Sequence, residues 1–477
     1  MSDSLKKQAI KGIVWSAVER FSVQGVTFVV QIVLARLLTP DDFGIIGMLA
    51  IFLQIAQVFI DSGFANALIN KQDCTDADFS TVFYYNLGVA IILYLILYIA
   101  APFISAFYNI PLLVPVLRVQ SLVLIINALS IIQKTILVKR IDFKSQSKAT
   151  LISSTLSGLV GIFLAYKGLG VWALVAQQLL NSVLLLFLYL SIVRWIPQLL
   201  FYSESFRFVF NYGSKLLVSS IISVAYRNIY TIVIGKRFSS YELGLYTRAE
   251  NFALFPSNNI SNIISRAAFP VLSRVQNDDA QLIRFYKKLI SYSSFIIFPL
   301  MAGLIAVAKP FIIVVLTDKW VDSVVLMQIL CVSWMFDHLC NLNLNLLYVK
   351  GRTDLVLRLE VIKKILAIII LILSLPFGLI GMCWGLVIYT FVAVFINTFY
   401  TKKLFGYGWL QQLTDYIPYL VASGIMLIVV CISISQIESP LYQLLVGIIV
   451  GILIYTIISI IFFKNQLPEL KRIIKRN

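Results

Sequence analysis

Long apolar stretches follow one another along this chain with only short polar gaps between them. A helix needs about 20 mostly apolar residues to cross a membrane, because the hydrocarbon core is about 30 Å thick and a helix rises about 1.5 Å per residue. The sequence therefore predicts an all-α integral membrane protein with about fourteen transmembrane helices. We place them at 12–34, 43–69, 79–101, 115–137, 149–166, 171–193, 212–234, 245–270, 289–308, 324–348, 358–376, 380–400, 416–434 and 441–463.

Composition agrees with a membrane location. Hydrophobic residues make up 60% of the 477 residues and charged residues 13%, whereas a soluble domain carries about 25% charged residues. The net charge of +17 would suit a nucleic-acid-binding protein, but most lysines and arginines lie in alternate gaps between the apolar stretches. That bias is typical of cytoplasmic loops. It predicts that both termini are cytoplasmic, and it favours no nucleic-acid partner.

The sequence lacks the residues that several classes of function need. The five cysteines show no CxxC spacing, there is one histidine, and no GxxxxGK[ST] motif occurs. A structural zinc site, an HExxH metalloenzyme and a P-loop ATPase are therefore not expected, and no cofactor, metal or catalytic residue is predicted. The gaps are also too short for a soluble catalytic domain. The chain is expected to move a substrate across a membrane rather than to transform one.

An internal repeat divides the sequence. Residues 32–46 and 232–246 match at basic, hydroxyl, acidic and glycine positions, with Arg36 against Lys236 and Gly44 against Gly244. Repeats of this kind are common in transporters whose halves move against each other around a central site. We predict two six-helix lobes, 1–200 and 201–404. A C-terminal helix pair with a basic cytoplasmic tail, 405–477, lies outside the repeat.

Polar residues inside the apolar stretches fall on common helix faces. Such residues are costly in a bilayer unless they face a wet cavity or a partner, and their spacing at 100° per residue places them together. The substrate-binding candidates are Arg20, Gln24, Gln31, Asp61, Arg227, Arg248, Glu250, Asn251, Asn258, Asn262 and Arg266. The ion-coupling candidates are Glu19, Asp337 and His338.

Two interpretations of these faces stay open at this point. In one, they line a polar cavity between the halves, where the arginines attract an anionic or phosphate-bearing substrate. In the other, the charged groups pair internally and hold helices together. For His338, a hydrogen-bonded structural role competes with proton relay.

Four segments carry a resemblance to a known family: 34–44, 61–69, 168–175 and 246–250. With them the chain resembles the polysaccharide transporter family, the Wzx-like lipopolysaccharide and exopolysaccharide flippases of the multidrug/oligosaccharidyl-lipid/polysaccharide (MOP) exporter superfamily. The resemblance covers essentially the whole chain. It implies a MATE/MOP-like fold of two lobes and a location in the bacterial inner membrane.

The resemblance also implies a function. It implies that a polyprenyl-diphosphate-linked oligosaccharide is flipped by alternating access, coupled to an ion gradient or the membrane potential. The expected partners are the lipid-linked oligosaccharide, membrane lipid and other polysaccharide-assembly proteins. Cationic residues such as Arg20, Arg227 and Arg248 would contact the diphosphate. The alternatives are a small-molecule or drug antiporter of the same superfamily and a membrane-embedded glycan polymerase or glycosyltransferase.

Overall fold

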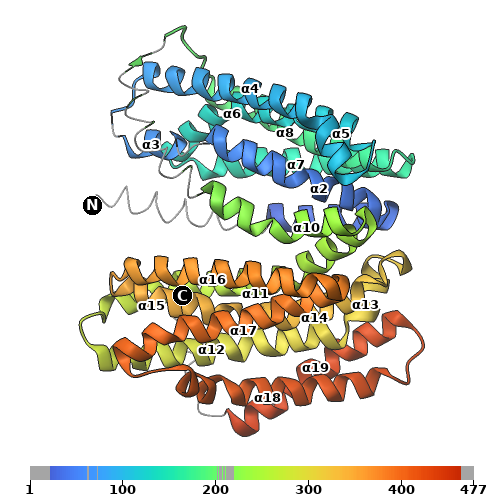
Figure 1. Ribbon diagram of the computed structural model, residues 1–477, viewed down its shortest axis with the longest axis vertical. Coiled ribbons are helices and arrows are strands. Elements are labelled where there is room, and N and C mark those ends of the chain that lie inside the picture. Colours follow the sequence, from blue (N-terminus) through green and yellow to red (C-terminus); the bar gives the residue numbers. More distant parts are fainter. Residues whose placement is uncertain are drawn as a thin grey trace. The chain divides into compact units, whose positions relative to one another are not determined.

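A computed structural model describes residues 22–61, 64–71, 73–200, 202–203, 207, 210, 217 and 220–463. Every element within these residues is a helix (Figure 1). Ten helical stretches are long and apolar enough to cross a membrane, and one of them, 353–405, contains two long helices of 22 and 28 residues. The chain is thus a multi-pass α-helical membrane protein. The total of about fourteen spans stays a prediction, because residues 1–21 and most of 201–219 lie outside the described part.

The chain divides into two compact units, residues 1–244 and 245–477. The boundary predicted at residue 200 separates the two copies of the sequence repeat rather than the two compact units, and it stays a prediction. A helix at 22–37 precedes the labelled helices of the first unit. These are α2 (Pro40–Asp61), α3 (Phe64–Asn70), α4 (Asp76–Tyr108), α5 (Leu113–Gln120), α6 (Leu122–Lys139), α7 (Phe143–Tyr166), α8 (Val171–Val193), α10 (Ile229–Arg237) and the first turn of α11 (Ser240–Arg274).

The rest of α11 belongs to the second unit. Its other helices are α12 (Asp279–Ala306), α13 (Ala308–Val315), η1 (Asp318–Trp320), α14 (Ser323–Met335), α15 (Asp337–Val349), α16 (Thr353–Ser374), η2 (Leu375–Phe377), α17 (Gly378–Phe405), α18 (Trp409–Ile434) and α19 (Pro440–Phe462).

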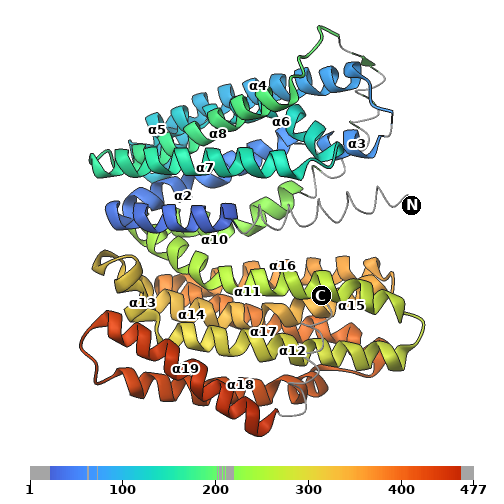
Figure 2. The ribbon, with the colours of Figure 1, turned by 180° about the vertical axis from the view of Figure 1, so that it is seen from behind.

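The tight hairpins expected at 149–193 and 358–400 are confirmed. α7 and α8 pack side by side, and so do α16 and α17 (Figure 2). Gly168 and Gly170 take φ values of +81° and +56° in the first turn, and Gly378 takes +74° in the second. Glycine adopts this left-handed region without the steric cost that a Cβ would bring. The short glycine-containing breaks therefore mark real chain reversals.

Other predicted spans differ in detail. The stretch 115–137 is two helices, α5 and α6, that meet at Ser121, and 324–348 is split at Phe336 into α14 and α15. The span expected at 289–308 begins earlier, as α12, because Asp278 caps the helix by accepting from the Gln281 amide at 3.0 Å. Hydropathy locates the apolar core of a helix, whereas a side-chain cap decides where the helix begins.

The lipid-facing side of these helices is apolar. On α19 the exposed residues include Ile452 and Ile461, which are 62% and 64% exposed. The small residues of α19 face inward instead: a Cβ on Gly447 would lie 2.6 Å from Val307 Cγ1, and Gly451 faces Val430. Small residues let membrane helices approach closely. The Gly447–Gly451 pair therefore packs α19 within its own chain.

Candidate functional site

The first unit carries a polar face on α2. Gln54, Gln57 and Asp61 recur at three- and four-residue spacing, so they lie along one side of the helix. The Gln57 amide donates to Asp61 Oδ1 at 3.0 Å, and Asn127 of α6 donates to Gln57 Oε1 at 3.2 Å. The Asp61 carboxylate is exposed within the first unit. This confirms that the polar residues of α2 share a face, while their use by a substrate stays a prediction.

The segment that leads into α10 extends this face. Asn228 is buried, and its amide donates to Gln54 Oε1 at 3.0 Å. Its neighbour Arg227 is exposed. Asn228 therefore fastens this segment to α2 and places Arg227 near the polar face. Gln24 and Gln31 are both half-buried on the 22–37 helix. Glu19 and Arg20 lie outside the described residues.

The second unit carries a longer polar face on α11. Asn251, Asn258 and Arg266 are exposed within this unit, and the Asn262 amide donates to Asn258 Oδ1 at 2.9 Å. These positions lie within about 100° of arc on the helix. Polar residues exposed along one side of a helix in an apolar chain need water or a polar ligand beside them. This is the second candidate surface for substrate.

Two candidates on α11 differ from that exposed group. Arg248 is buried, with 8% exposure, although the helical spacing places it on the same face as Arg266. Glu250 is half-buried, and its carboxylate accepts a hydrogen bond from the Tyr246 hydroxyl at 3.3 Å. Removing either charge would disturb helix packing as well as any ligand contact. Arg248 and Glu250 are therefore weaker candidates for direct substrate contact than Arg266.

The break between α14 and α15 lies at the ion-coupling candidates. α14 ends at Met335 and α15 begins at Asp337, whose carboxylate accepts from the Asn341 amide at 2.8 Å. Discontinuous helices in transporters often present freed backbone groups to ions. Here, however, the freed Met335 carbonyl is taken by His338.

His338 is held on every side. Its Nδ1 lies 2.9 Å from the Met335 carbonyl, its Nε2 lies 3.1 Å from Ser294 Oγ, and its ring packs 5.4 Å from the Phe298 ring. A carbonyl only accepts, so Nδ1 donates, and in the neutral ring Nε2 accepts from the serine. Both ring nitrogens are thus engaged. This arrangement supports the structural role for His338 and leaves Asp337 as the better ion-coupling candidate in this unit.

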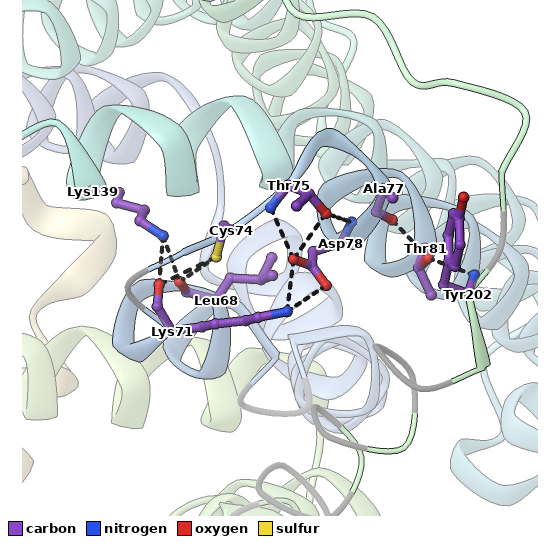
Figure 3. Close-up of polar contacts among 9 residues, drawn as sticks. All are labelled: Leu68, Lys71, Cys74, Thr75, Ala77, Asp78, Thr81, Lys139 and Tyr202. Carbon is purple, nitrogen blue, oxygen red and sulfur yellow. Dashed lines mark hydrogen bonds and ion pairs between the residues drawn. The ribbon is translucent and has the colours of Figure 1, made fainter.

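A charged cluster at the end of α3 was not among the predicted site residues (Figure 3). Lys71 Nζ contacts both carboxylate oxygens of Asp78 at 2.8 Å, and Asp78 also closes a capping box with Thr75. Lys139 of α6 donates to the Lys71 and Leu68 carbonyls at 2.6 and 3.3 Å. Because these groups satisfy one another, the cluster fixes α3 against α4 and α6. A basic residue about 70 positions from its partner gives no local signal in the sequence.

A buried amide network docks α18 onto the second unit. Asn343 and Gln412 exchange two amide hydrogen bonds of 3.0 and 2.9 Å, and Thr401 donates to Asn343 Oδ1 at 2.9 Å. All three are 0% exposed. Just before α18, the Tyr407 hydroxyl donates to Asp415, and burial and this carboxylate raise the Tyr407 pKa well above its usual value. α18 is therefore an integral part of this unit.

A family model described as "Polysaccharide biosynthesis protein" matches residues 33–325, which is more than half of the chain. The chain belongs to this family. Relatives include the lipopolysaccharide biosynthesis protein WzxC of Escherichia coli (strain K12), 26% identical, with 88% of this chain and 86% of that protein covered. The succinoglycan biosynthesis transport protein ExoT of Rhizobium meliloti (strain 1021) is 22% identical, with 97% and 95% covered.

The fold has a solved counterpart. The lipid II flippase MurJ, in an inward closed conformation, matches with a TM-score of 0.75, 17% identity, and coverage of 95% of this chain and 100% of that one. At this identity the likeness concerns the fold. Together with the family match, it confirms the fold class and the resemblance drawn from the sequence.

Proposed function

We propose that this protein moves a polyprenyl-diphosphate-linked oligosaccharide, a repeat unit of a surface polysaccharide, across a bacterial inner membrane by alternating access. The family match supports this function, and so does the similarity to ExoT, which is named as a succinoglycan transport protein. The fold of a lipid flippase supports it further. Both termini would be cytoplasmic, as the distribution of lysines and arginines predicts.

The observation that carries the proposal is the pair of polar faces on α2 and α11. Each interrupts an otherwise lipid-compatible helix with amides and charges, which suit the many hydroxyl groups of a sugar. Arg227 and Arg266 are exposed within their units, and a guanidinium fork matches the oxygens of a diphosphate. Each face by itself therefore offers donors for both parts of a lipid-linked oligosaccharide.

A transport role without catalysis belongs to the same proposal. The carboxylates described above, Asp61 and Asp337, are each hydrogen-bonded by an amide on the same helix. We assign Asp337 to ion coupling, because it is an acidic residue at a break in a membrane helix.

Deletion of the gene in its host tests the proposal. The expected result is loss of the surface polysaccharide, with its lipid-linked repeat unit accumulating on the cytoplasmic leaflet, and restoration of both by the wild-type gene. Unchanged surface glycan and lipid-linked intermediates would overturn the proposal. Accumulation of short, unpolymerised glycan on the outer face would instead indicate a polymerase, and altered drug resistance alone would indicate an antiporter.

A further inference from the structure

A lysine is buried inside a membrane helix of the second unit. Lys363 lies in the predicted span 358–376, about ten residues or roughly 15 Å after α16 begins at Thr353. Its side chain is 7% exposed, and its ammonium forms an ion pair with the Glu360 carboxylate at 2.5 Å. A buried charge inside a membrane helix is costly unless other groups compensate it, and such charges are commonly functional. The partners of Lys363 therefore decide its role.

A second carboxylate belongs to the same cluster. α15 packs against α16, and the Asp337 carboxylate of α15 is close enough to the Lys363 ammonium for the two charges to attract each other. Cys340, one turn after Asp337, is buried and lies within electrostatic range of both charges and of Glu360. Two carboxylates thus share one ammonium among these helices.

An amide from α17 adds unused hydrogen-bonding capacity to the cluster. Asn397 is 0% exposed, and its side chain faces the Cys340 thiol. Apart from that weak partner, neither the amide nitrogen nor the amide oxygen of Asn397 has a hydrogen-bond partner among the described residues. A carboxyl group donates when it is protonated and only accepts when it is ionised. A spare donor and a spare acceptor beside the carboxylates therefore suit a site whose proton content changes.

The neighbouring helices add titratable groups that stay neutral. Tyr286 of α12 is buried beside Cys340, and Tyr400 of α17 lies beside Arg352 near the start of α16. Both nitrogens of the His338 ring are engaged by hydrogen bonds, as described above. A tyrosine hydroxyl ionises only near pH 10 in water, and burial disfavours its charged form further. The charge of the cluster is therefore set by its two carboxylates and its ammonium.

Charge balance decides what the cluster can bind. With both carboxylates ionised, the three groups carry one uncompensated negative charge, which is unfavourable away from water. One proton removes this charge and needs no shell of ligands. A metal cation would instead have to bind beside a tethered ammonium that repels it. The cluster therefore favours a proton over a sodium ion.

We propose that Lys363 is the built-in counter-cation of a proton site at Asp337. When Asp337 is protonated, the ammonium stays on Glu360, and when Asp337 releases its proton to water, the ammonium is drawn to the Asp337 carboxylate. Lys363 keeps its own proton throughout, so each passage through both states takes up one proton from water and returns one. The inference rests on the proposed function, in which Asp337 couples transport to an ion, and it names that ion and the residue that selects it.

Infrared titration of the protein in membranes tests this switch directly. The C=O stretching band of protonated carboxyl groups is followed as the pH is raised, and the part that is lost in Asp337→Asn is assigned to Asp337. We expect Lys363→Gln to move the midpoint of this band at least about one unit to higher pH, because an attracting charge beside the carboxylate is removed. Glu360→Gln should move it to lower pH, because a repelling charge is removed and the ammonium is freed for Asp337.

The opposite signs separate a charge switch from a structural role, which would lower stability without moving the midpoint. Arg358→Gln is the matched control, because it removes an exposed cation from the same helix and should leave the midpoint unchanged. Glu360→Gln keeps the test available if Lys363→Gln does not accumulate. An Asp337 band that is absent at every pH, or a midpoint that does not shift in the stated direction in the variants that accumulate, would overturn the proposal.

Flipping by the reconstituted protein gives a second readout. An imposed proton gradient should accelerate the flipping of the lipid-linked oligosaccharide, whereas a sodium gradient at constant pH should not. Acceleration by the sodium gradient alone would overturn the assignment of the proton. If the infrared midpoints shift as expected but the wild type flips no substrate, the proton site stands and the proposed function fails.

Discussion

At the scale of single residues, arginines with the same predicted role are in different environments. Arg227 and Arg266 are exposed within their units, whereas Arg248 is buried. A hydrogen bond to a charged group contributes about 1.5–3 kcal/mol. We therefore expect Arg227→Gln and Arg266→Gln each to lower the transport rate about tenfold or more, without changing the amount of protein in the membrane.

Arg274 supplies the matched control for that comparison. It is exposed at the last turn of the same helix as Arg266, beyond the polar face, so Arg274→Gln should transport at the wild-type rate. Arg248→Gln should instead lower the amount of folded protein, because it removes a buried group from its surroundings. Wild-type transport in both Arg227→Gln and Arg266→Gln would contradict the predicted contact of these arginines with the diphosphate.

Asp337 and His338 are adjacent but should respond differently to substitution. Asp337→Asn keeps the size of the side chain and removes the charge, so we expect transport to lose its dependence on an imposed proton or sodium gradient. His338→Gln should lower thermal stability, because it breaks two buried hydrogen bonds, and should keep the gradient dependence. Transport by reconstituted protein at set gradients measures the gradient dependence of both variants, and thermal unfolding measures the stability of His338→Gln. An unchanged gradient response in Asp337→Asn would exclude it from coupling.

Helical spacing correctly predicted which polar residues of α2, and which of α11, share a face. It did not reveal the partners of those residues. The contacts of Asn228 with Gln54 and of Asn127 with Gln57 join helices far apart in sequence, and no local pattern encodes them. The burial of Arg248 was missed for the same reason, since spacing gives the direction of a side chain but not what covers it.

At the scale of elements, the sequence predicted hairpins better than breaks. Glycines with positive φ mark the turns before α8 and α17, and these turns appear in the sequence as glycine between apolar runs. The breaks at Ser121 and Phe336 interrupt the helices at single residues that carry no proline or glycine. Hydropathy averaged over a span does not register one residue, so both spans were predicted as continuous helices.

The amide network of α15, α17 and α18 allows a prediction at this scale. Gln412→Leu leaves the Asn343 amide buried without its partner, which costs about 1–3 kcal/mol. Asn343→Leu should cost a similar amount, since the hydrogen bonds are reciprocal. The midpoint temperature of thermal unfolding in detergent should therefore fall by several degrees for each variant. The double variant should lose less than the sum of the two, because no amide of the pair remains unpaired. Strictly additive losses would contradict the network.

At the scale of the whole molecule, the repeat is the feature that connects fold and function. It was visible in the sequence as matching segments around Gly44 and Gly244, and the structure gives the match a physical basis in a reciprocal backbone contact. The C-terminal pair outside the repeat is not a loose addition, because α18 is anchored by buried hydrogen bonds.

The most direct test of the central claim is a flipping measurement with purified components. The protein is reconstituted into vesicles that hold its host's polyprenyl-diphosphate-linked oligosaccharide, and the appearance of the sugar on the opposite leaflet is followed with an impermeant glycan-modifying enzyme. We predict a rate that rises with protein content and falls at least about tenfold in Arg266→Gln. A rate equal to that of protein-free vesicles, with the protein folded and correctly inserted, would contradict the account.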